Sequence, residues 1–312
     1  MALPYQWQYR LDRWKAALQG FFGRGNQQPR PKLCPSCGSL VGINATRCHQ
    51  CGTNLKFSMA AVNRRLSGVF SGPAPVTTAL LVSNLLMFGV EWMALAAHGG
   101  GGGLSILWGV GGEASYRLGM SAPYGIYVQH QWYRLITAMF LHGGLIHIGF
   151  NMMALMQLGP ALEELYGSSR YFFLYIVTGA FGFLVSAYPW GFWGSGSLSL
   201  GASGGLLGLV GAMLAVTTKR GGAYMRELRS RLVSSVVILF VLGFMGMGMD
   251  NKAHLAGLAS GFVLGKIFAD RQPMTVRERQ IANALGWLAG IAVIASFAFM
   301  ILHYRDPLPG QA

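Results

Sequence analysis

The stretch Ala-His-Leu-Ala-Gly-Leu-Ala-Ser-Gly-Phe-Val-Leu-Gly, residues 253–265, decides how this chain folds. Its three glycines and His254 recur at intervals of three, four and four residues, so they share one face of a helix. A second apolar segment carries a matching stripe of small residues just after Ser203: Gly204, Gly208 and Ala212. Such faces let two membrane helices approach closely. We therefore expect these two helices to pack together and to bring His254 beside Ser203.

The composition of the chain places these helices in a membrane. Of the 312 residues, 53% are hydrophobic and only 11% are charged. Soluble domains carry charge at about a quarter of their positions, so a single soluble enzyme is excluded. Glycine is also in excess, with 45 residues, and close helix packing explains part of that excess. We predict a polytopic all-α membrane protein.

Seven apolar stretches are the candidate membrane spans. They lie at about 76–97, 141–162, 171–188, 203–218, 232–249, 253–269 and 281–302. The first and last are long enough to cross a hydrocarbon core of ~30 Å at 1.5 Å per residue. The fourth would be only ~24 Å long before Lys219, so Ser203 should lie several ångströms below the outer surface. The stretch 191–200 would then dip into the membrane, where irregular backbone is tolerated only if it lines protein or a watery cavity.

Basic residues are distributed unevenly between the two sides of these spans. The net charge is +14, and 19 Lys and Arg residues fall on the side of the N-terminal segment, against four on the other side. Cytoplasmic segments of membrane proteins carry the excess of basic residues. We expect a multi-pass protein of a bacterial inner (plasma) membrane with its N-terminus in the cytoplasm and its C-terminus outside. The charge therefore reflects topology and implies no nucleic-acid partner.

The chain divides into five predicted parts. Residues 1–30 form a basic amphipathic segment, 31–57 a zinc ribbon, 58–75 a linker, 76–270 the membrane core, and 271–312 a linker with the seventh transmembrane helix. Trp and Leu residues recur at helical spacing in the first part. This helix would either lie in the bilayer interface or pack on its own domain.

All four cysteines lie in one short window, and they are the candidate metal ligands. They form two Cys-x-x-Cys-Gly knuckles: Cys34, Cys37, Cys48 and Cys51. This spacing predicts a tetrahedral Zn(2+) site with four thiolate ligands. Two disulfides are the alternative, which a reducing cytoplasm disfavours. A closed shell leaves no position for a catalytic water, so the zinc would be structural, and the ribbon could also receive a cytoplasmic protein partner.

Polar side chains inside the spans are costly and therefore indicate functional sites. His147 and Asn151 lie four residues apart and share one helix face; a hydrogen-bonded pair that only stabilises packing is the alternative. Glu91 is the only acid within a predicted span. Asp250 lies one turn before His254 and could orient its ring, but in an outer loop we expect Asp250 to be solvated.

Four strings in this order resemble the rhomboid family of intramembrane serine proteases. They are Trp-Tyr-Arg at 132–134, the stretch 142–151 that carries His147 and Asn151, Gly-Ala-Ser-Gly at 201–204, and 253–261. The resemblance covers roughly residues 76–269. It implies a six-helix catalytic core followed by a seventh helix, a soluble N-terminal extension, and transmembrane proteins as substrates.

The resemblance also implies roles for single residues. Ser203 would be the nucleophile and His254 the general base, a dyad with no carboxylate and no catalytic cofactor. The oxyanion would be held by the His147 and Asn151 side chains and by the Ser203 backbone N–H. Glu163 resembles a structural glutamate of the family. Some members carry an aromatic ring, stacked on the histidine, at the position of Leu207, so that ring contact is expected to be missing here.

Two other functions remain as alternatives. A catalytically inactive rhomboid-like protein would bind transmembrane clients without cutting them, but it usually lacks the serine or the histidine. A transporter or channel would require paired charges at mid-membrane and repeated halves, and no internal repeat is evident in the sequence.

Overall fold

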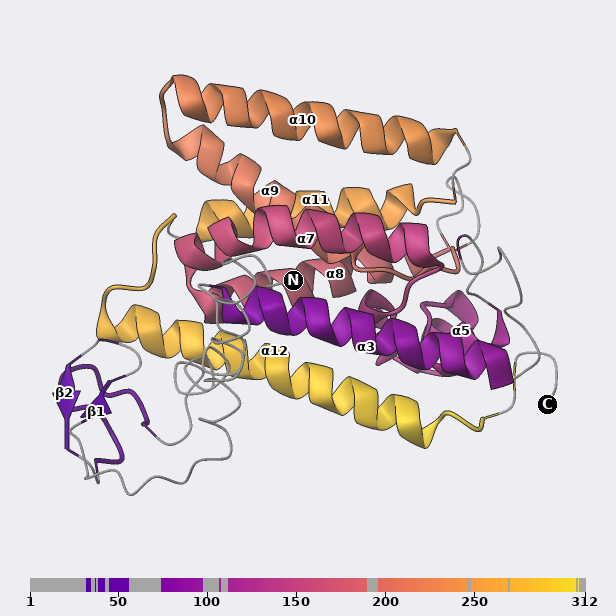
Figure 1. The fold of residues 1–312 in the computed structure, drawn as a ribbon, viewed down its shortest axis with the longest axis horizontal. Coiled ribbons are helices and arrows are strands. Elements are labelled where there is room, and N and C mark those ends of the chain that lie inside the picture. The colour runs from indigo at the N-terminus through magenta and orange to yellow at the C-terminus, as the bar shows by residue number, and fades with distance from the viewer. Residues whose placement is uncertain are drawn as a thin grey trace, which may run out of the picture.

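Figure 1 shows the fold of the computed structural model, which describes the following residues: 32–34, 37, 39–42, 45–55, 74–97, 107, 112–189, 196–245, 248–268, 270–306 and 308. The predicted amphipathic segment 1–30 lies outside the described residues, as does most of the predicted linker 58–75.

Seven helices of 17 to 27 residues dominate the described part of the chain. They are α3 (Pro75–Ala97), α7 (Leu145–Tyr166), α8 (Ser168–Ala187), α9 (Ser203–Lys219), α10 (Ala223–Phe244), α11 (Asn251–Ile267) and α12 (Val276–Leu302). Of these, α3, α7, α8 and α12 are long and apolar enough to cross a membrane, and α9 is apolar but shorter. The prediction of an all-α membrane protein is confirmed.

The helix at the fifth predicted span begins before that span and ends before the span does. The sequence placed this span at 232–249, whereas α10 runs from Ala223 to Phe244. Hydropathy excludes the basic stretch 226–231 from a span, but Arg, Glu and Leu are good helix formers. The helix therefore continues through that stretch without a break.

Helix α9 lies at the centre of the bundle and α10 at its edge (Figure 1). Every residue of α9 from Gly204 to Ala212 is buried. In α10, all of which the structure describes, Leu232 is the one buried residue. The two neighbouring helices therefore differ sharply in how much the rest of the protein holds them.

Helices α9 and α11 pack along the predicted stripe of small residues. A Cβ placed on Gly257 would lie 2.2 Å from the carbonyl oxygen of Gly204, and one on Gly261 would lie 1.9 Å from that of Gly208. These distances are far below van der Waals contact, so only glycine fits. The predicted close contact of these two helices is confirmed.

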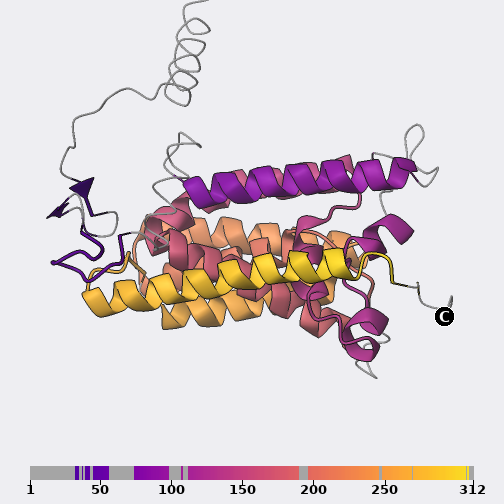
Figure 2. The ribbon, with the colours of Figure 1, turned by 90° about the horizontal axis from the view of Figure 1, so that it is seen from below.

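Residues 112–140, between α3 and α7, form several short helical elements. These are α5 (Glu113–Arg117), the π-helix η1 (Tyr124–Val128), α6 (Arg134–Thr137) and the 3-10 helix η2 (Ala138–Phe140). Arg134 is buried and donates to the backbone oxygens of Tyr116 and Met120. Helix α12 packs on the same region, because Phe297 contacts Phe140 with ring centroids 5.4 Å apart. Figure 2 shows α12 running along the bundle toward this end.

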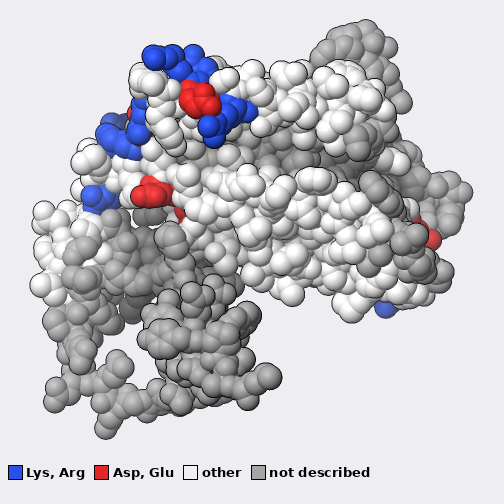
Figure 3. Space-filling model, turned by 45° about the horizontal axis from the view of Figure 1, so that its top comes forward, with Lys and Arg blue, Asp and Glu red and all other residues white. Residues whose placement is uncertain are grey.

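Basic residues gather at the opposite end of the bundle, where α9 ends and α10 begins (Figure 3). The exposed ones there are Lys219, Arg220, Arg226, Arg229 and Arg231. Two short strands, β1 (Lys32–Leu33) and β2 (Leu40–Val41), pair antiparallel near the start of α12 (Figure 1). The described part of the predicted ribbon therefore lies toward the basic end.

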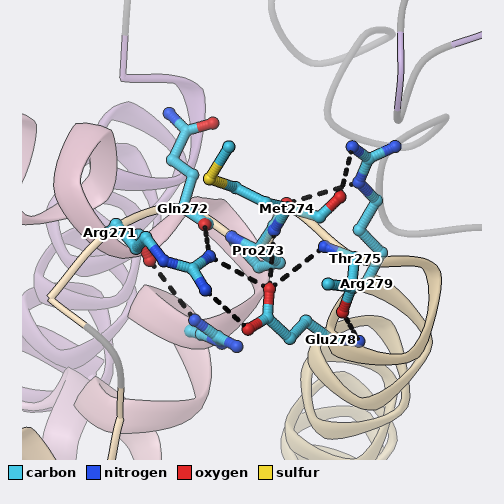
Figure 4. A network of polar contacts seen from close by, with 8 residues as sticks. Arg271, Gln272, Pro273, Met274, Thr275, Glu278 and Arg279 are labelled. Atoms are coloured by element: carbon cyan, nitrogen blue, oxygen red, sulfur yellow. Dashed lines mark hydrogen bonds and ion pairs between the residues drawn. The ribbon is translucent and has the colours of Figure 1, made fainter.

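The connection from α11 to α12 is fixed by one carboxylate (Figure 4). Glu278 accepts hydrogen bonds from the Arg271 guanidinium at 2.9 and 3.0 Å and from the Met274 and Thr275 backbone N–H groups at 2.8 and 3.1 Å. Thr275 Oγ1 in turn accepts from the Glu278 N–H at 3.1 Å, which completes a capping box. The start of α12 is thereby held against the preceding loop.

Candidate functional site

Ser203 and His254 lie at the first turns of α9 and α11. Ser203 Oγ and His254 Nε2 are 2.7 Å apart, which is hydrogen-bonding distance. His254 is buried, and the Gly257 contact with Gly204 sets the separation of the two helices one turn below the pair. Chemically, this geometry lets an imidazole take the proton of a serine hydroxyl.

The second ring nitrogen of His254 has no carboxylate partner. Nδ1 is buried and has no hydrogen-bond partner among the described residues. Asp250 instead accepts from the Ala253 N–H at 3.0 Å and from the Ser186 hydroxyl. Asp250 is half-buried, and through the Ala253 N–H it caps the N-terminus of α11.

His147 and Asn151 face the chain just before Ser203. A Cβ placed on Gly201 would lie 2.7 Å from both Cε1 and Nε2 of His147 and 3.7 Å from Nδ2 of Asn151. The Asn151 Nδ2 group is buried and has no hydrogen-bond partner among the described residues. Gly201 has φ +125°, so this position requires glycine both for its backbone and for the space that the His147 ring occupies.

The tautomer of His147 follows from its other ring nitrogen. The backbone N–H of Gly143 donates to Nδ1 at 3.2 Å, so in the neutral ring Nδ1 carries no proton. The ring proton is therefore on Nε2, which is the nitrogen next to Gly201. The site thus presents two side-chain N–H donors, and the start of α9 adds backbone N–H groups that have no acceptor within the helix.

An aromatic contact to His254 comes from an unexpected helix. Leu207 is buried in α9, and Phe240 on α10 meets the His254 ring edge to face, with centroids 6.4 Å apart. Phe240 could not be identified from the sequence, because family resemblance points to a ring on α9 and nothing in the sequence places α10 against α11. The sequence likewise assigns no specific contact to Gly143 or Gly201.

The four cysteines converge on one point. Their Sγ atoms all lie within 4.8 Å of one another, with Cys34 and Cys51 at 3.5 Å and Cys37 and Cys48 at 3.6 Å. None of the four is in a disulfide. Four thiolates ~2.3 Å from a tetrahedral ion would be ~3.8 Å apart, so this cluster fits a metal ion.

The acidity of Cys37 suits a metal ligand. Burial raises the pKa of the Cys37 thiol, but hydrogen bonding to the Ser39 side chain and backbone lowers it more, to about 6. The thiolate, which is the form that binds metal, is then accessible at neutral pH.

Comparison with known proteins identifies the family. Residues 129–271 match the family model of the rhomboid domain. The chain is 30% identical to "Rhomboid protease GluP" of Bacillus subtilis over 201 residues, which are 63% of this chain and 35% of that protein. It is 35% identical over 153 residues to "Rhomboid-type serine protease 2" of Emericella nidulans, covering 48% of this chain and 29% of that protein. It is 39% identical over 140 residues to "RHOMBOID-like protein 6, mitochondrial" of Arabidopsis thaliana, covering 43% of each. The chain spans less than half the length of these relatives, and its residues 129–271 are a domain of the rhomboid family.

Proposed function

We propose that this chain is an intramembrane serine endopeptidase that cleaves transmembrane proteins with a Ser203–His254 dyad. The single observation that carries the proposal is the 2.7 Å separation of Ser203 Oγ and His254 Nε2 beside two side-chain donors. Two of the relatives are named proteases, one of them of the serine type.

The proposed reaction starts at the Ser203 hydroxyl. His254 Nε2 takes its proton while Oγ attacks the carbonyl carbon of the scissile peptide bond. The negative oxygen of the tetrahedral intermediate accepts hydrogen bonds from His147 Nε2–H, Asn151 Nδ2–H and the Ser203 N–H. The protonated His254 then gives its proton to the leaving amine, and an acyl-enzyme remains. A water molecule, deprotonated by His254, attacks the ester carbonyl; the acyl carbon–Oγ bond breaks, the carboxylic acid product leaves, and His254 returns its proton to Ser203 Oγ.

The packing of the bundle supports a lateral entry for a substrate helix. Helix α10 buries one of its residues and yet carries Phe240 against the dyad histidine. Helix α10 has far fewer buried residues than α9 or α11, so it is the helix beside the dyad that is most easily displaced. We propose that substrates reach Ser203 from this side.

The zinc site and the topology belong to the same proposal. We propose that the cysteine cluster binds one structural Zn(2+) on the cytoplasmic side of a plasma membrane and that the C-terminus lies outside. The domain layout is the one predicted from the sequence, with the core at 76–270. Metal analysis of the purified full chain should find one zinc ion per chain.

A cleavage assay in detergent separates the protease from an inactive client-binding protein. The full-length chain should cut a type I model transmembrane substrate, and the variants Ser203→Ala and His254→Ala should not. The three proteins are compared at the same concentration, and their melting temperatures should be the same. If wild type and Ser203→Ala give the same products, the protease proposal is contradicted. A catalytically inactive protein that binds transmembrane clients is then the better interpretation.

A further inference from the structure

Glu91 is a buried acid that the proposed reaction does not use. It lies in α3, one of the membrane-spanning helices, and its side chain is fully shielded from solvent. Ionisable groups at such positions are costly and usually serve a function. What Glu91 holds is therefore informative.

The Glu91 carboxylate binds the turn that precedes α7. One oxygen accepts the backbone N–H of His142 at 3.0 Å, and the other accepts the hydroxyl of Ser115. The backbone N–H of the next residue, Gly143, is the one that donates to His147 Nδ1. Two consecutive N–H groups thus bind two different acceptors, one on α3 and one in the candidate oxyanion site.

The ring of His142 reinforces this arrangement. It meets the His147 ring edge to face, with centroids 5.2 Å apart, and it is fully buried. If the turn moved away from Glu91, both the Gly143 N–H and the His142 ring would shift relative to His147. The hydrogen bond from the His142 N–H to Glu91 opposes this movement.

We propose that Glu91 is a positioning residue for the oxyanion site. By anchoring the His142 N–H, it keeps the Gly143 N–H on His147 Nδ1, and it thereby holds the His147 proton on Nε2, facing Gly201. Groups that orient a donor in this way matter because small displacements at the reacting atoms cost much of the rate. The inference rests on the proposed protease function.

Glu163 provides a matched control within the same pair of helices. It lies near the end of α7, is also buried, and accepts the N–H groups of Val76 and Thr77 at 3.0 and 2.8 Å and the Ser168 hydroxyl at 2.7 Å. Glu91 thus ties α3 to the start of α7, and Glu163 ties α7 to the start of α3. The two carboxylates play similar structural parts, but only Glu91 is linked to His147.

The test compares Glu91→Met with Glu163→Met in the full chain, with kcat, KM and the melting temperature measured for each. We expect Glu91→Met to lower kcat about tenfold with little change in KM, because one oxyanion donor is worth at least that much. Glu163→Met should lower the melting temperature but leave kcat of the folded protein within about twofold of wild type. Glu91→Gln, which keeps an oxygen acceptor for the His142 N–H, should recover most of kcat.

A second readout does not depend on activity. With histidine labelled by ¹⁵N, NMR of wild type should show His147 protonated on Nε2, and Glu91→Met should show a mixture of tautomers. Ser115→Ala, a milder change, should shift kcat in the same direction. An unchanged His147 signal in Glu91→Met, or an equal loss of kcat in Glu91→Met and Glu163→Met, overturns the inference. A wild type that shows the expected tautomer but cleaves nothing contradicts the proposed function and leaves the positioning role of Glu91 standing.

Discussion

The two neighbours of α9 are held in opposite ways. Helix α11 meets α9 through glycines, backbone against backbone, whereas in α10 only Leu232 is buried and the other residues are half-buried or exposed. The first contact fixes the distance between Ser203 and His254, and we propose that the second lets α10 move aside for a substrate. One helix beside Ser203 is therefore held tightly and the other loosely.

The largest expected effect comes from breaking the rigid contact. In Gly261→Ala the new Cβ would lie 1.9 Å from the Gly208 carbonyl oxygen, and backbone cannot move aside as a side chain can. We expect a loss of about 3 kcal/mol or more of stability and no cleavage. The melting temperature and the cleavage rate measure this.

Gly89→Ala is the control for that substitution. Gly89 is a helical glycine in α3 with nothing within 4 Å of a new Cβ. It should be neutral or stabilising by up to ~1 kcal/mol, because alanine is the better helix former. Equal behaviour of the two variants would refute the role given to the glycine contact.

The next largest effect is expected at the proposed oxyanion site, beside His147 and Asn151. Gly201→Ala would strain a backbone at φ +125° and press against the His147 ring. We expect kcat to fall about a hundredfold, the size seen when an oxyanion donor is lost, with a smaller loss of stability. Gly149→Ala, on α7 with open space around its Cβ, should keep wild-type kcat. Wild-type kcat in Gly201→Ala would show that this glycine does not face the reacting atoms.

A smaller effect is expected on the loosely held side. Phe240→Ala removes the ring that meets His254, and such aromatic contacts are worth about 0.5–1.5 kcal/mol. We expect kcat to fall about threefold to tenfold while the melting temperature hardly changes. The matched variant is Ile238→Ala, an exposed neighbour on the same helix. Similar kcat values for both variants would show that the Phe240 ring does not support His254 in the reaction.

The smallest expected effect is on stability and comes from an ion pair at the C-terminal end of α9. Arg220, just after α9, pairs with Asp270, just after α11, at 2.7 Å, and the Arg220 hydrogen bond lowers the pKa of Asp270. Because the folded pKa is depressed, the stabilisation is present above the ordinary Asp value of ~3.9 and is lost as the pH falls through the folded pKa. The pair is partly exposed, so Asp270→Asn should cost about 1 kcal/mol or less at neutral pH. A melting temperature that differs from wild type by the same amount at pH 2 and pH 7 would contradict this assignment.

The sequence shows which helices must touch because glycine spacing is itself a packing rule. That rule names Gly257 and Gly261, and both lie where α11 meets α9. It says nothing about contacts that depend on turns or on the direction of a side chain. The Gly143 N–H on His147, the Asp250 cap and the Phe240 ring are of this kind. Helix α10 differs from the predicted span 232–249 for another reason. Hydropathy indicates which residues lie in the membrane, whereas helix propensity indicates which residues form a helix.

The most direct test of the account is to identify the serine that reacts. The full-length chain in membranes should be treated with a fluorophosphonate, which modifies activated serines, and the modified residue should be located by mass spectrometry. We predict that the label is on Ser203 and that it disappears in His254→Ala. A chain that cleaves its substrate while the label sits on another serine, or while Ser203 stays unmodified, would contradict the Ser203–His254 dyad.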